Sequence, residues 1–510
     1  MTQKKSLSTT DPLILIGIFI TAKFLLHLFT NTIYGFHRDE LLYMALGDHL
    51  MWGFQEVPPS IAIFAKLSGL IFSDTLAGYR FFPAVTGAAT VGLALLSVRM
   101  LGGKQLAILI TGITLLLSPT FLRMNTLFQP VTFDVFYWTL ILWLVLRVIN
   151  SSAKPSGWIW LGLAFGLGML NKYSIPFIAI PVALGLILTP NRSLLKTRWP
   201  WISIGIALLV WLPNLIWQIK NQFPVFDHMA ELRSNQLVHV SALDFVAGQV
   251  LLNLFVGLLF IPGLIWLIRS KEFRILAWIY GFSLLLFVLL SGKSYYLAGI
   301  YPVILAAGGV WFESWLASGK KWKVSLFGLL CLLNLPLVPY GLPLLPIDTM
   351  KSYSAYMAEN AGLTPPLIWE DDTVHDLPQD YADMFGWEEQ VRSITTVYYN
   401  LPDSIRNVTV IMTSNYGQAG ALAHFGKLYN LPYPVSLASS FYFFGPGNLP
   451  GKYILAVGYE KEDIEQFFAE MELKRIHTSS VARETRVEIW LCKDPKATLQ
   501  DAWPGFRDDR

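Results

Sequence analysis

The first forty residues, MTQKKSLSTTDPLILIGIFITAKFLLHLFTNTIYGFHRDE (Met1–Glu40), join a basic start to a long apolar run and an acidic end. The run over residues 13–33 is about as long as a helix that crosses a bilayer, which needs roughly 20 apolar residues. No small-residue cleavage site precedes Tyr34. We therefore expect this run to act as a first membrane anchor and not as a signal peptide.

The same alternation of apolar runs and charged connections continues to about residue 341. The chain is 54% hydrophobic and 14% charged, with a mean hydropathy of +0.48, which is far from an ordinary soluble composition. These features predict an α-helical polytopic membrane protein with about 11–13 transmembrane helices. The candidate spans are residues 13–33, 79–98, 105–122, 130–149, 157–171, 174–190, 199–217, 245–268, 274–291, 297–315 and 324–342. The apolar stretch 60–73 is expected to be an amphipathic helix in the membrane plane.

The charges between these runs sort by side of the membrane. The N-terminus and the even-numbered connections are basic, with Lys4, Lys5, Arg99, Lys104, Arg147, Lys154, Arg192, Lys196, Arg198, Arg269, Lys271, Arg274, Lys320, Lys321 and Lys323. The odd-numbered connections contain most of the acids. Because loops retained in the cytoplasm are rich in Lys and Arg, this pattern predicts a cytoplasmic N-terminus and carboxylates on the outer face. No separate basic surface suggests nucleic acid.

The composition changes after residue 346. Charges become frequent, and short strand-like runs (408–413, 453–457, 487–492) alternate with helical ones (387–400, 419–428, 461–473). We therefore expect a membrane domain over residues 1–345, with a first outer loop at 34–78, and an extracytoplasmic soluble α/β domain over 346–510. The only cysteines, Cys331 and Cys492, predict neither a disulfide nor a cysteine-based metal site.

The first outer loop contains the acids most suited to chemistry. Asp39 and Glu40 follow the first span, and Glu56 precedes Pro58-Pro59, which holds the backbone extended. A solvated helix cap would explain the first two alone. Other outer span ends add cations and tyrosines, namely Arg80, Arg123, Lys172, Lys293, Tyr295 and Tyr296, together with Asp134. Such a set suits a lipid-phosphate head group that carries a sugar.

Several stretches resemble one family. They are HRDELLY at 37–43, the Glu-x-Pro-Pro of 55–59, Arg80, NKYS at 171–174, PNLIWQ at 213–218, GKSYYLAGIYP at 292–302, YADMFGW at 381–387 and Asn415-Tyr416-Gly417. Together they resemble bacterial integral-membrane glycosyltransferases of glycosyltransferase family 39, the protein O-mannosyltransferase and lipid A aminoarabinose transferase type, which have the GT-C fold. The resemblance covers nearly the whole chain.

The resemblance implies a role for each acid. Asp39 matches an acid that acts as general base or orients the acceptor or a metal, and Glu40 accompanies it in a structural or hydrogen-bonding role. Glu56 matches a carboxylate implicated in metal or acceptor contact, so a divalent metal is possible. The relatives have Lys directly before Pro-Pro, where this chain has Val57. Arg80, Arg123, Lys172 or Lys293 would then meet the donor phosphate, with Tyr295 and Tyr296 beside them.

The expected reaction is sugar transfer, with inversion, from a polyprenyl-phosphate-linked donor to a lipid, glycan or protein acceptor. It would take place on the outer face of the cytoplasmic (inner) membrane. A positioned carboxylate would take the acceptor proton, and cations would stabilise the departing phosphate. Two alternatives are a polytopic transporter and a lipid-linked glycan ligase or scaffold of the same topology. Transporters place ionisable residues near the midplane on interrupted helices and often contain repeats, neither of which is evident here.

Overall fold

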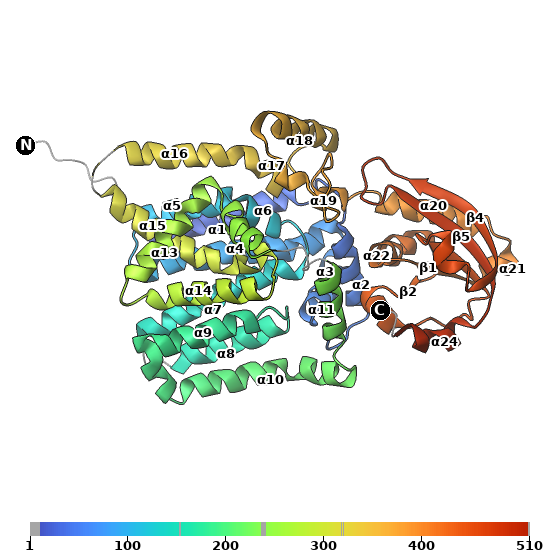
Figure 1. The fold of residues 1–510 in the computed structure, drawn as a ribbon, viewed down its shortest axis with the longest axis horizontal. Helices are drawn as coiled ribbons and strands as arrows, with labels where there is room; N and C mark the ends of the chain where they lie inside the picture. The colour runs from blue at the N-terminus through green and yellow to red at the C-terminus, as the bar shows by residue number, and fades with distance from the viewer. Residues whose placement is uncertain (1–10, 152–154, 236–240, 318, 320, 508–510) are drawn as a thin grey trace, which may run out of the picture. The chain divides into compact units, whose positions relative to one another are not determined.

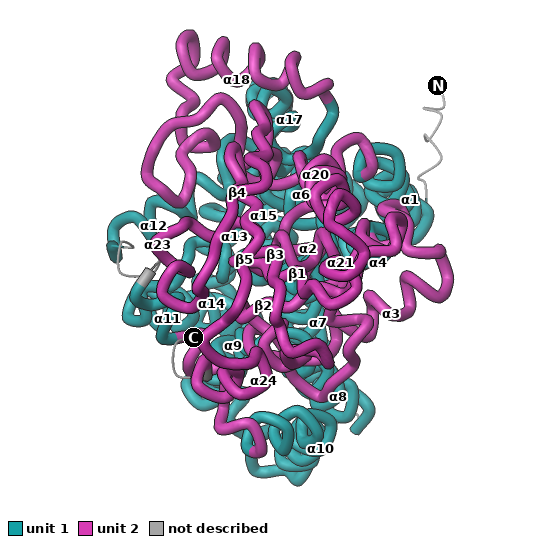
Figure 2. Tube along the Cα trace, turned by 90° about the vertical axis from the view of Figure 1, so that its right-hand side faces the viewer, with its two compact units in different colours: residues 1–31, 80–219, 230–344 teal, residues 32–79, 220–229, 345–510 magenta. Residues whose placement is uncertain are grey.

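The computed structural model describes residues 11–151, 155–235, 241–317, 319 and 321–507. The chain divides into two compact units, which Figures 1 and 2 trace. Unit 1 contains residues 1–31, 80–219 and 230–344, and unit 2 contains residues 32–79, 220–229 and 345–510. Four basic residues used to predict the topology lie outside the described residues: Lys4, Lys5, Lys154 and Lys320.

Unit 1 is helical, and every candidate span coincides with one or more of its helices. They are α1 (Pro12–Thr30), α4 (Leu76–Met100), α5 (Gln105–Leu117), α6 (Pro119–Met124), α7 (Pro130–Ser151), α8 (Pro155–Met169), α9 (Pro176–Leu188), η1 (Pro190–Lys196), α10 (Trp199–Lys220), α12 (Ala242–Leu251), η3 (Phe255–Leu259), α13 (Phe260–Arg269), α14 (Arg274–Leu289), η4 (Ser294–Ile300), α15 (Tyr301–Leu316), α16 (Trp322–Asn334), η5 (Leu335–Leu337) and α17 (Val338–Gly341). Helix α11 (Pro224–Asn235) begins in unit 2 and ends in unit 1.

Fewer of these helices than expected cross a membrane unbroken. Within the described residues, six are long and apolar enough, or eight if two bent pairs each count as one span. The pairs bend by 106° at the start of η1 and by 105° between α12 and η3. Elsewhere, Ser118 is extended before Pro119 and ends α5 early, since a residue before proline disfavours the helical region. The apolar pattern thus marks the spans but not their breaks.

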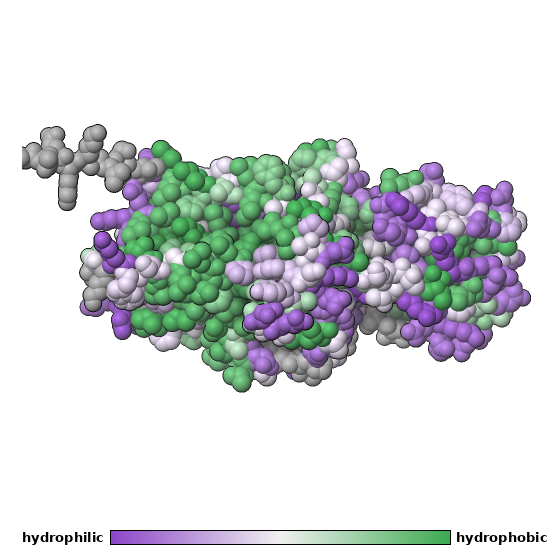
Figure 3. Space-filling model, turned by 90° about the horizontal axis from the view of Figure 1, so that it is seen from above, coloured by the Kyte–Doolittle hydropathy of each residue, from purple (hydrophilic) through white to green (hydrophobic). Residues whose placement is uncertain are grey.

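The surface of unit 1 is apolar, as lipid-facing helices require. Leucines at residues 209 and 289 are 70% and 71% exposed, and apolar side chains cover much of the helical part in Figure 3. Its interior is also apolar, centred on buried Trp138, Leu267 and Ile304. Since both the inside and the outside of this unit are apolar, a bilayer is the solvent that it fits. The chain is a multi-pass membrane protein.

Unit 2 contains a mixed sheet and residues 34–78, which keep the name first outer loop although their side of the membrane stays a prediction. Its elements are α2 (Arg38–Asp48), α3 (Ser60–Phe72), α18 (Ile347–Ala361), η6 (Pro365–Leu367), α19 (Gln379–Ala382), α20 (Trp387–Tyr399), α21 (Asp403–Arg406), β1 (Thr409–Thr413), α22 (Tyr416–Phe425), η7 (Gly426–Tyr429), β2 (Val435–Ser436), η8 (Ser439–Phe444), β3 (Tyr453–Val457), α23 (Lys461–Ile464), β4 (Phe468–Thr478), β5 (Arg486–Pro495), α24 (Leu499–Ala502) and η9 (Trp503–Arg507). The strand order is β2-β1-β3-β5-β4; β1 is parallel to β2 and β3, and the other pairs are antiparallel.

The predicted α/β character is confirmed, with one error. The strands expected near 408–413, 453–457 and 487–492 are β1, β3 and β5, and the helices expected near 387–400 and 419–428 correspond to α20 and to α22 with η7. The helix expected over 461–473 is wrong: only α23 is helical, and β4 pairs with β5 from Phe468 to Thr478. Local helix propensity is a weak preference, which pairing with the next strand along the chain overrides.

The first outer loop belongs to the same compact unit as the C-terminal residues. The expected helix over 60–73 is α3, and its orientation to the membrane stays a prediction. Helix α2 packs on α3 and on α22, which lies more than 370 residues later in the chain. Helix α2, which contains Asp39 and Glu40, therefore lies against residues of the C-terminal part.

Candidate active site

Helix α2 begins with a closed set of hydrogen bonds. His37 is the N-cap, and its Nδ1 accepts a hydrogen bond from the Asp39 backbone N–H at 3.1 Å. The His37 backbone N–H donates to Glu40 Oε2 at 2.8 Å. Glu40 is fully buried, so its carboxylate completes a capping box. Asp39 lies between them, half-buried at the start of the helix.

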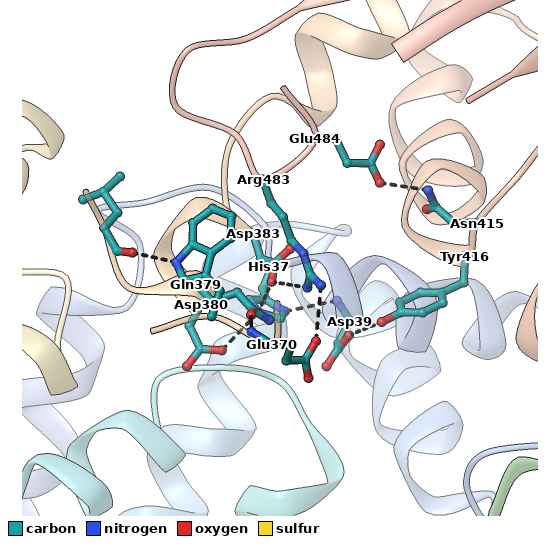
Figure 4. Close-up of polar contacts among 12 residues, drawn as sticks. His37, Asp39, Glu370, Gln379, Asp380, Asp383, Asn415, Tyr416, Arg483 and Glu484 are labelled. Carbon is teal, nitrogen blue, oxygen red and sulfur yellow. Dashed lines mark hydrogen bonds and ion pairs between the residues drawn. The ribbon is translucent and has the colours of Figure 1, made fainter. Parts of the chain in front are cut away.

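The Asp39 carboxylate also contacts the C-terminal part of unit 2. Tyr416 Oη donates to Asp39 Oδ1 at 3.0 Å (Figure 4). The Arg38 guanidinium lies 4.4 Å from the centroid of the same tyrosine ring. Burial, followed by the charge of Asp39, raises the pKa of the Tyr416 phenol well above its usual range. Tyr416 is therefore a neutral donor at any physiological pH.

Glu56 has a partner of the same kind. Ser440 Oγ donates to Glu56 Oε2, and the Gln55 backbone N–H donates to Ser440 Oγ at 3.0 Å. Burial raises the pKa of the Glu56 carboxyl against the opposing effect of hydrogen bonds from the Ser440 hydroxyl and from backbone N–H groups, and the charge of Asp39 raises it further. Glu56 Oε1 is buried and has no hydrogen-bond partner among the residues that the structure describes. The two acids are thus electrostatically coupled within unit 2.

A charge network lies behind the α2 cap, with His37 and Asp383 buried and Asp380 and Glu370 exposed. His37 Nε2 lies 3.6 Å from Asp380 Oδ1 and 3.9 Å from Asp383 Oδ2. Arg483 bridges Asp383 and Glu370, each at 3.2 Å (Figure 4). Burial by itself lowers the pKa of His37, but the interaction with the Asp380 carboxylate and the charges of Asp39 and Asp383 outweigh it and raise the pKa overall. The raised pKa favours the charged ring, whereas the hydrogen bond from the Asp39 N–H requires His37 Nδ1 without a proton, so charging His37 would break this part of the cap.

The candidate phosphate-binding residues lie in unit 1. Lys172, between α8 and α9, is half-buried, with its Nζ 5.5 Å and 5.3 Å from the ring centroids of Tyr295 and Tyr296. The charges of Asp134 and Lys293 both act on Lys172. The Asp134 carboxylate accepts a hydrogen bond from Ser174 Oγ. The N-terminal ends of α7 and η4 thus bring together two lysines, two tyrosines and one carboxylate, which interact through Lys172.

The two arginines on the candidate list differ from these lysines. Arg80 is 1% exposed, and its guanidinium donates to the Asn31 backbone carbonyl, so it takes part in packing between α4 and the end of α1. Arg123 lies in the last turn of α6 and is half-buried. The structure therefore groups Lys172, Lys293, Tyr295 and Tyr296 together and gives Arg80 a structural contact.

A metal site was left open by the sequence. Among the described residues, no group of three or more His, Cys, Asp or Glu side chains is arranged to hold a metal ion. Among the described acids of the first outer loop, only Glu56 has a carboxylate oxygen, Oε1, that is buried and lacks a hydrogen-bond partner. A single oxygen does not make a metal site.

Sequence reasoning missed four residues that contact the acids or their helix cap: His37, Asp383, Tyr416 and Ser440. Three of them lie within stretches already singled out, since His37 is in HRDELLY, Asp383 in YADMFGW and Tyr416 in Asn415-Tyr416-Gly417. Those stretches were the available signal. Nothing in the local pattern around Ser440 marks it as a partner of Glu56.

Comparison with known proteins gives sequence matches to sugar transferases. The family described as dolichyl-phosphate-mannose-protein mannosyltransferase matches residues 56–217. Lipid A galacturonosyltransferase of Rhizobium johnstonii is 24% identical over 219 residues, which are 42% of this chain and 46% of that protein. Undecaprenyl phosphate-alpha-4-amino-4-deoxy-L-arabinose arabinosyl transferase of Serratia proteamaculans is 25% identical over 318 residues, which are 55% and 54% of the two chains. The matched region thus spans about half the length of these relatives.

The fold comparison covers nearly the whole chain. The crystal structure of ArnT from Cupriavidus metallidurans bound to undecaprenyl phosphate superposes with a TM-score of 0.63 at 14% identity, and covers 93% of this chain and 97% of that one. Its apo state gives a TM-score of 0.58 over 94% and 97%. These structures show the fold. The matches of sequence and fold confirm the resemblance: this chain resembles the bacterial GT-C integral-membrane glycosyltransferases and has the GT-C fold, with helical membrane spans and a small C-terminal sheet.

Proposed function

We propose that this protein is a glycosyltransferase that moves a sugar from a polyprenyl-phosphate-linked donor to a lipid, glycan or protein acceptor, with inversion. The observation that carries the proposal is the Asp39 carboxylate, held at the start of α2 by the His37 cap and by the Tyr416 hydroxyl. A carboxylate fixed in this way suits proton abstraction from a hydroxyl. The sequence matches to two sugar transferases support the same reaction class.

In the proposed reaction, the acceptor oxygen attacks the anomeric carbon opposite the phosphate. A new C–O bond forms as the anomeric carbon–phosphate oxygen bond breaks, and polyprenyl phosphate leaves with the bonding electrons. The acceptor proton passes to the Asp39 carboxylate. Glu56, with one oxygen held by Ser440, would orient the acceptor, and Glu40 would hold the helix cap.

The departing phosphate needs positive charge, because its own charge grows as the bond breaks. We assign this role first to Lys172 and Lys293, with the hydroxyls of Tyr295 and Tyr296 as further donors. Arg123 is a secondary candidate. Arg80, which donates to the Asn31 carbonyl, would support the fold of the site and not bind phosphate itself. Val57 leaves the position before Pro58-Pro59 without the cation of the relatives.

We further propose that the acids face the outer side of the cytoplasmic membrane and that the N-terminus is cytoplasmic. Single cysteines at Lys271 and Lys427 test this, in a background with Cys331 and Cys492 replaced by serine. An impermeant maleimide added to intact cells should label position 427 and spare position 271. The opposite pattern would overturn the orientation.

The activity is tested by Asp39→Asn, which keeps the side-chain volume and removes the base. Envelope lipids and glycans of a deletion strain, complemented with each variant, are compared by mass spectrometry. Wild type should restore the sugar-modified product, and Asp39→Asn should not. The matched control is Asp48→Asn, which changes an exposed acid of the same helix, paired with Lys427 at 2.9 Å, and should restore the product. Restoration by Asp39→Asn at equal protein level would reject the proposed base.

A further inference from the structure

We propose that Tyr416 and Ser440 are positioning residues of the active site, which orient Asp39 and Glu56 respectively, so that the C-terminal part of the chain completes the catalytic centre. This inference rests on the proposed function. It assigns a catalytic purpose to two residues that lie 377 and 384 positions from the acids they contact. Figure 4 shows the first of these contacts and the residues that support it.

Tyr416 is itself held in place from two sides. It is the first residue of α22, whose N-cap is Asn415, and Asn415 Oδ1 accepts a hydrogen bond from the Gln418 backbone N–H at 3.0 Å. The Asn415 amide donates to Glu484 Oε1 at 2.8 Å, and the Gln418 amide donates to Glu484 Oε2 at 2.9 Å. The start of α22 is therefore fixed to the residues that precede β5. The Tyr416 ring projects from this fixed end.

Two glycines let α22 approach α2 closely enough for the contact. A Cβ at Gly420 would lie 2.6 Å from the Leu41 carbonyl carbon, and one at Gly417 would lie 2.7 Å from Arg38 Cγ. Both distances are shorter than real Cβ atoms adopt, so a larger residue would force the helices apart. A purely structural contact between two helices does not require a tyrosine hydroxyl aimed at a carboxylate.

The chemistry of the Tyr416–Asp39 contact fits a positioning role. A neutral phenol donates one hydrogen bond, which stabilises the charged form of a carboxylate and fixes its rotation. Arg38 lies against the ring face and holds the tyrosine by a cation–π contact. With Oδ1 engaged, the orientation of the second oxygen is set.

Ser440 acts in the same way on Glu56. It is fully buried in η8 and joins two neighbouring groups, since it accepts from the Gln55 backbone N–H and donates to Glu56 Oε2. The other Glu56 oxygen is left in a defined direction. Asp39 and Glu56 thus each accept a hydroxyl hydrogen bond from the C-terminal part of unit 2.

The test uses the full-length protein in detergent with a polyprenol-lipid extract of host membranes as substrate, and follows release of polyprenyl phosphate by mass spectrometry. Tyr416→Phe keeps the ring over Arg38 and removes only the hydroxyl. The loss of a hydrogen bond to a charged group should lower the saturated rate about 10- to 100-fold. The amount of extract that gives half the maximal rate should change little. The acid limb of the pH–rate profile should move to higher pH, because the charged carboxylate loses stabilisation.

Matched controls distinguish the loss of a hydroxyl that orients a catalytic acid from the loss of a hydroxyl that only contributes to packing. Tyr459→Phe removes a tyrosine hydroxyl that donates to the Thr413 carbonyl at 3.0 Å in the same unit, and should leave rate and pH profile unchanged. Ser440→Ala should lower the rate about tenfold or more, whereas Ser436→Ala, which also loses a hydrogen bond to the Thr413 carbonyl, should not. If Tyr416→Phe does not fold, the comparison of Ser440→Ala with Ser436→Ala tests the inference instead.

The outcomes distinguish this inference from the proposed function. Wild-type release with an inactive Asp39→Asn, together with a normal rate and pH profile in folded Tyr416→Phe or Ser440→Ala, overturns the inference alone. Absence of release by wild type, or activity in Asp39→Asn, overturns the proposed function. A reduced rate in Tyr459→Phe equal to that of Tyr416→Phe also rejects the inference, since the effect would then be one of general packing.

Discussion

Arg483 Nη1 lies 3.2 Å from Asp383 Oδ2 and joins the turn before β5 to the network behind the α2 cap. The Asp383 side chain is 3% exposed, and it also faces His37. Burial raises the pKa of Asp383, while the charges of His37 and Arg483 oppose that rise. The start of α2, where Asp39 lies, is therefore tied to the C-terminal sheet by charge as well as by the tyrosine.

Arg483→Met should destabilise the protein. The variant removes a charge-assisted hydrogen bond from a buried carboxylate, which costs about 1.5–3 kcal/mol. Arg486→Met is the control. Arg486 forms an ion pair with Glu488, but its side chain is 62% exposed, and exposed ion pairs contribute little to the free energy of unfolding. The measurement is the midpoint of unfolding of the full-length protein in detergent. Equal midpoints for the two variants would show that the Arg483–Asp383 pair does not hold this region.

Replacing His37 should change how stability depends on pH. Its folded pKa is raised, so its stabilising contribution is complete below the unfolded value of about 6.5 and is lost as pH rises through the folded pKa. His37→Asn keeps a capping side chain and removes the titration. The wild type should exceed the variant in thermal midpoint most at pH 5.5–6.5, and the gap should narrow toward pH 9. Asp380→Asn should reduce the same pH dependence, and a gap that is constant with pH would contradict the assignment.

The sequence predicted the class of fold because a bilayer imposes its demands locally. Each apolar segment lies on helix, since a chain in lipid must satisfy its backbone hydrogen bonds within the segment. The breaks at Pro119 and Phe255 were not predicted, because the apolar pattern resumes on the far side of each after only a few other residues. The strand β4 was missed for a different reason: its partner β5 is required to make Phe468–Thr478 a strand, and local composition does not contain that information.

The candidate site likewise contains residues that local motifs predict and residues that only the packing of distant segments brings together. Asp39 and Glu56 were predicted from short motifs, since acids beside an apolar span or before Pro-Pro are visible locally. Tyr416 and Ser440 were not, because their contacts join residues 377 and 384 positions apart. Arg80 was expected to meet the donor phosphate, which stays a prediction; its burial and its bond to the Asn31 carbonyl depend on how α1 and α4 pack, which the sequence does not contain. Motifs thus identify acids, whereas packing decides which cations are accessible.

Binding of the donor phosphate should depend on Lys172 and Lys293 of unit 1. Lys172→Met and Lys293→Met each remove a charge-assisted contact worth about 1.5–3 kcal/mol, so donor use should fall about 10- to 100-fold. Raising the amount of polyprenol-lipid extract should partly restore the Lys293→Met rate if the loss is in donor binding. Lys271→Met, an exposed lysine of a predicted cytoplasmic connection, is the control. Normal donor use in both variants would move the phosphate to Arg123.

Adding a single Cβ atom tests whether the transfer rate requires the close packing of α22 on α2. Gly420→Ala adds a Cβ that would lie 2.6 Å from the Leu41 carbonyl carbon and 2.7 Å from its oxygen. Since both are backbone atoms, the helices must separate, which should cost about 1–3 kcal/mol of stability. Separation also lengthens the Tyr416–Asp39 hydrogen bond, so the transfer rate should fall even at temperatures where the variant is fully folded.

The matched variant is Gly426→Ala, at the end of the same helix, where the nearest atom to an added Cβ is Leu431 Cβ at 3.5 Å. This is ordinary van der Waals contact, so Gly426→Ala should retain both stability and rate. The two variants make the same chemical change and differ in what the new methyl group meets. If Gly420→Ala lowered stability yet kept the full rate, the α2–α22 contact would serve the fold alone, and Asp39 would be oriented by the His37 cap without help from Tyr416.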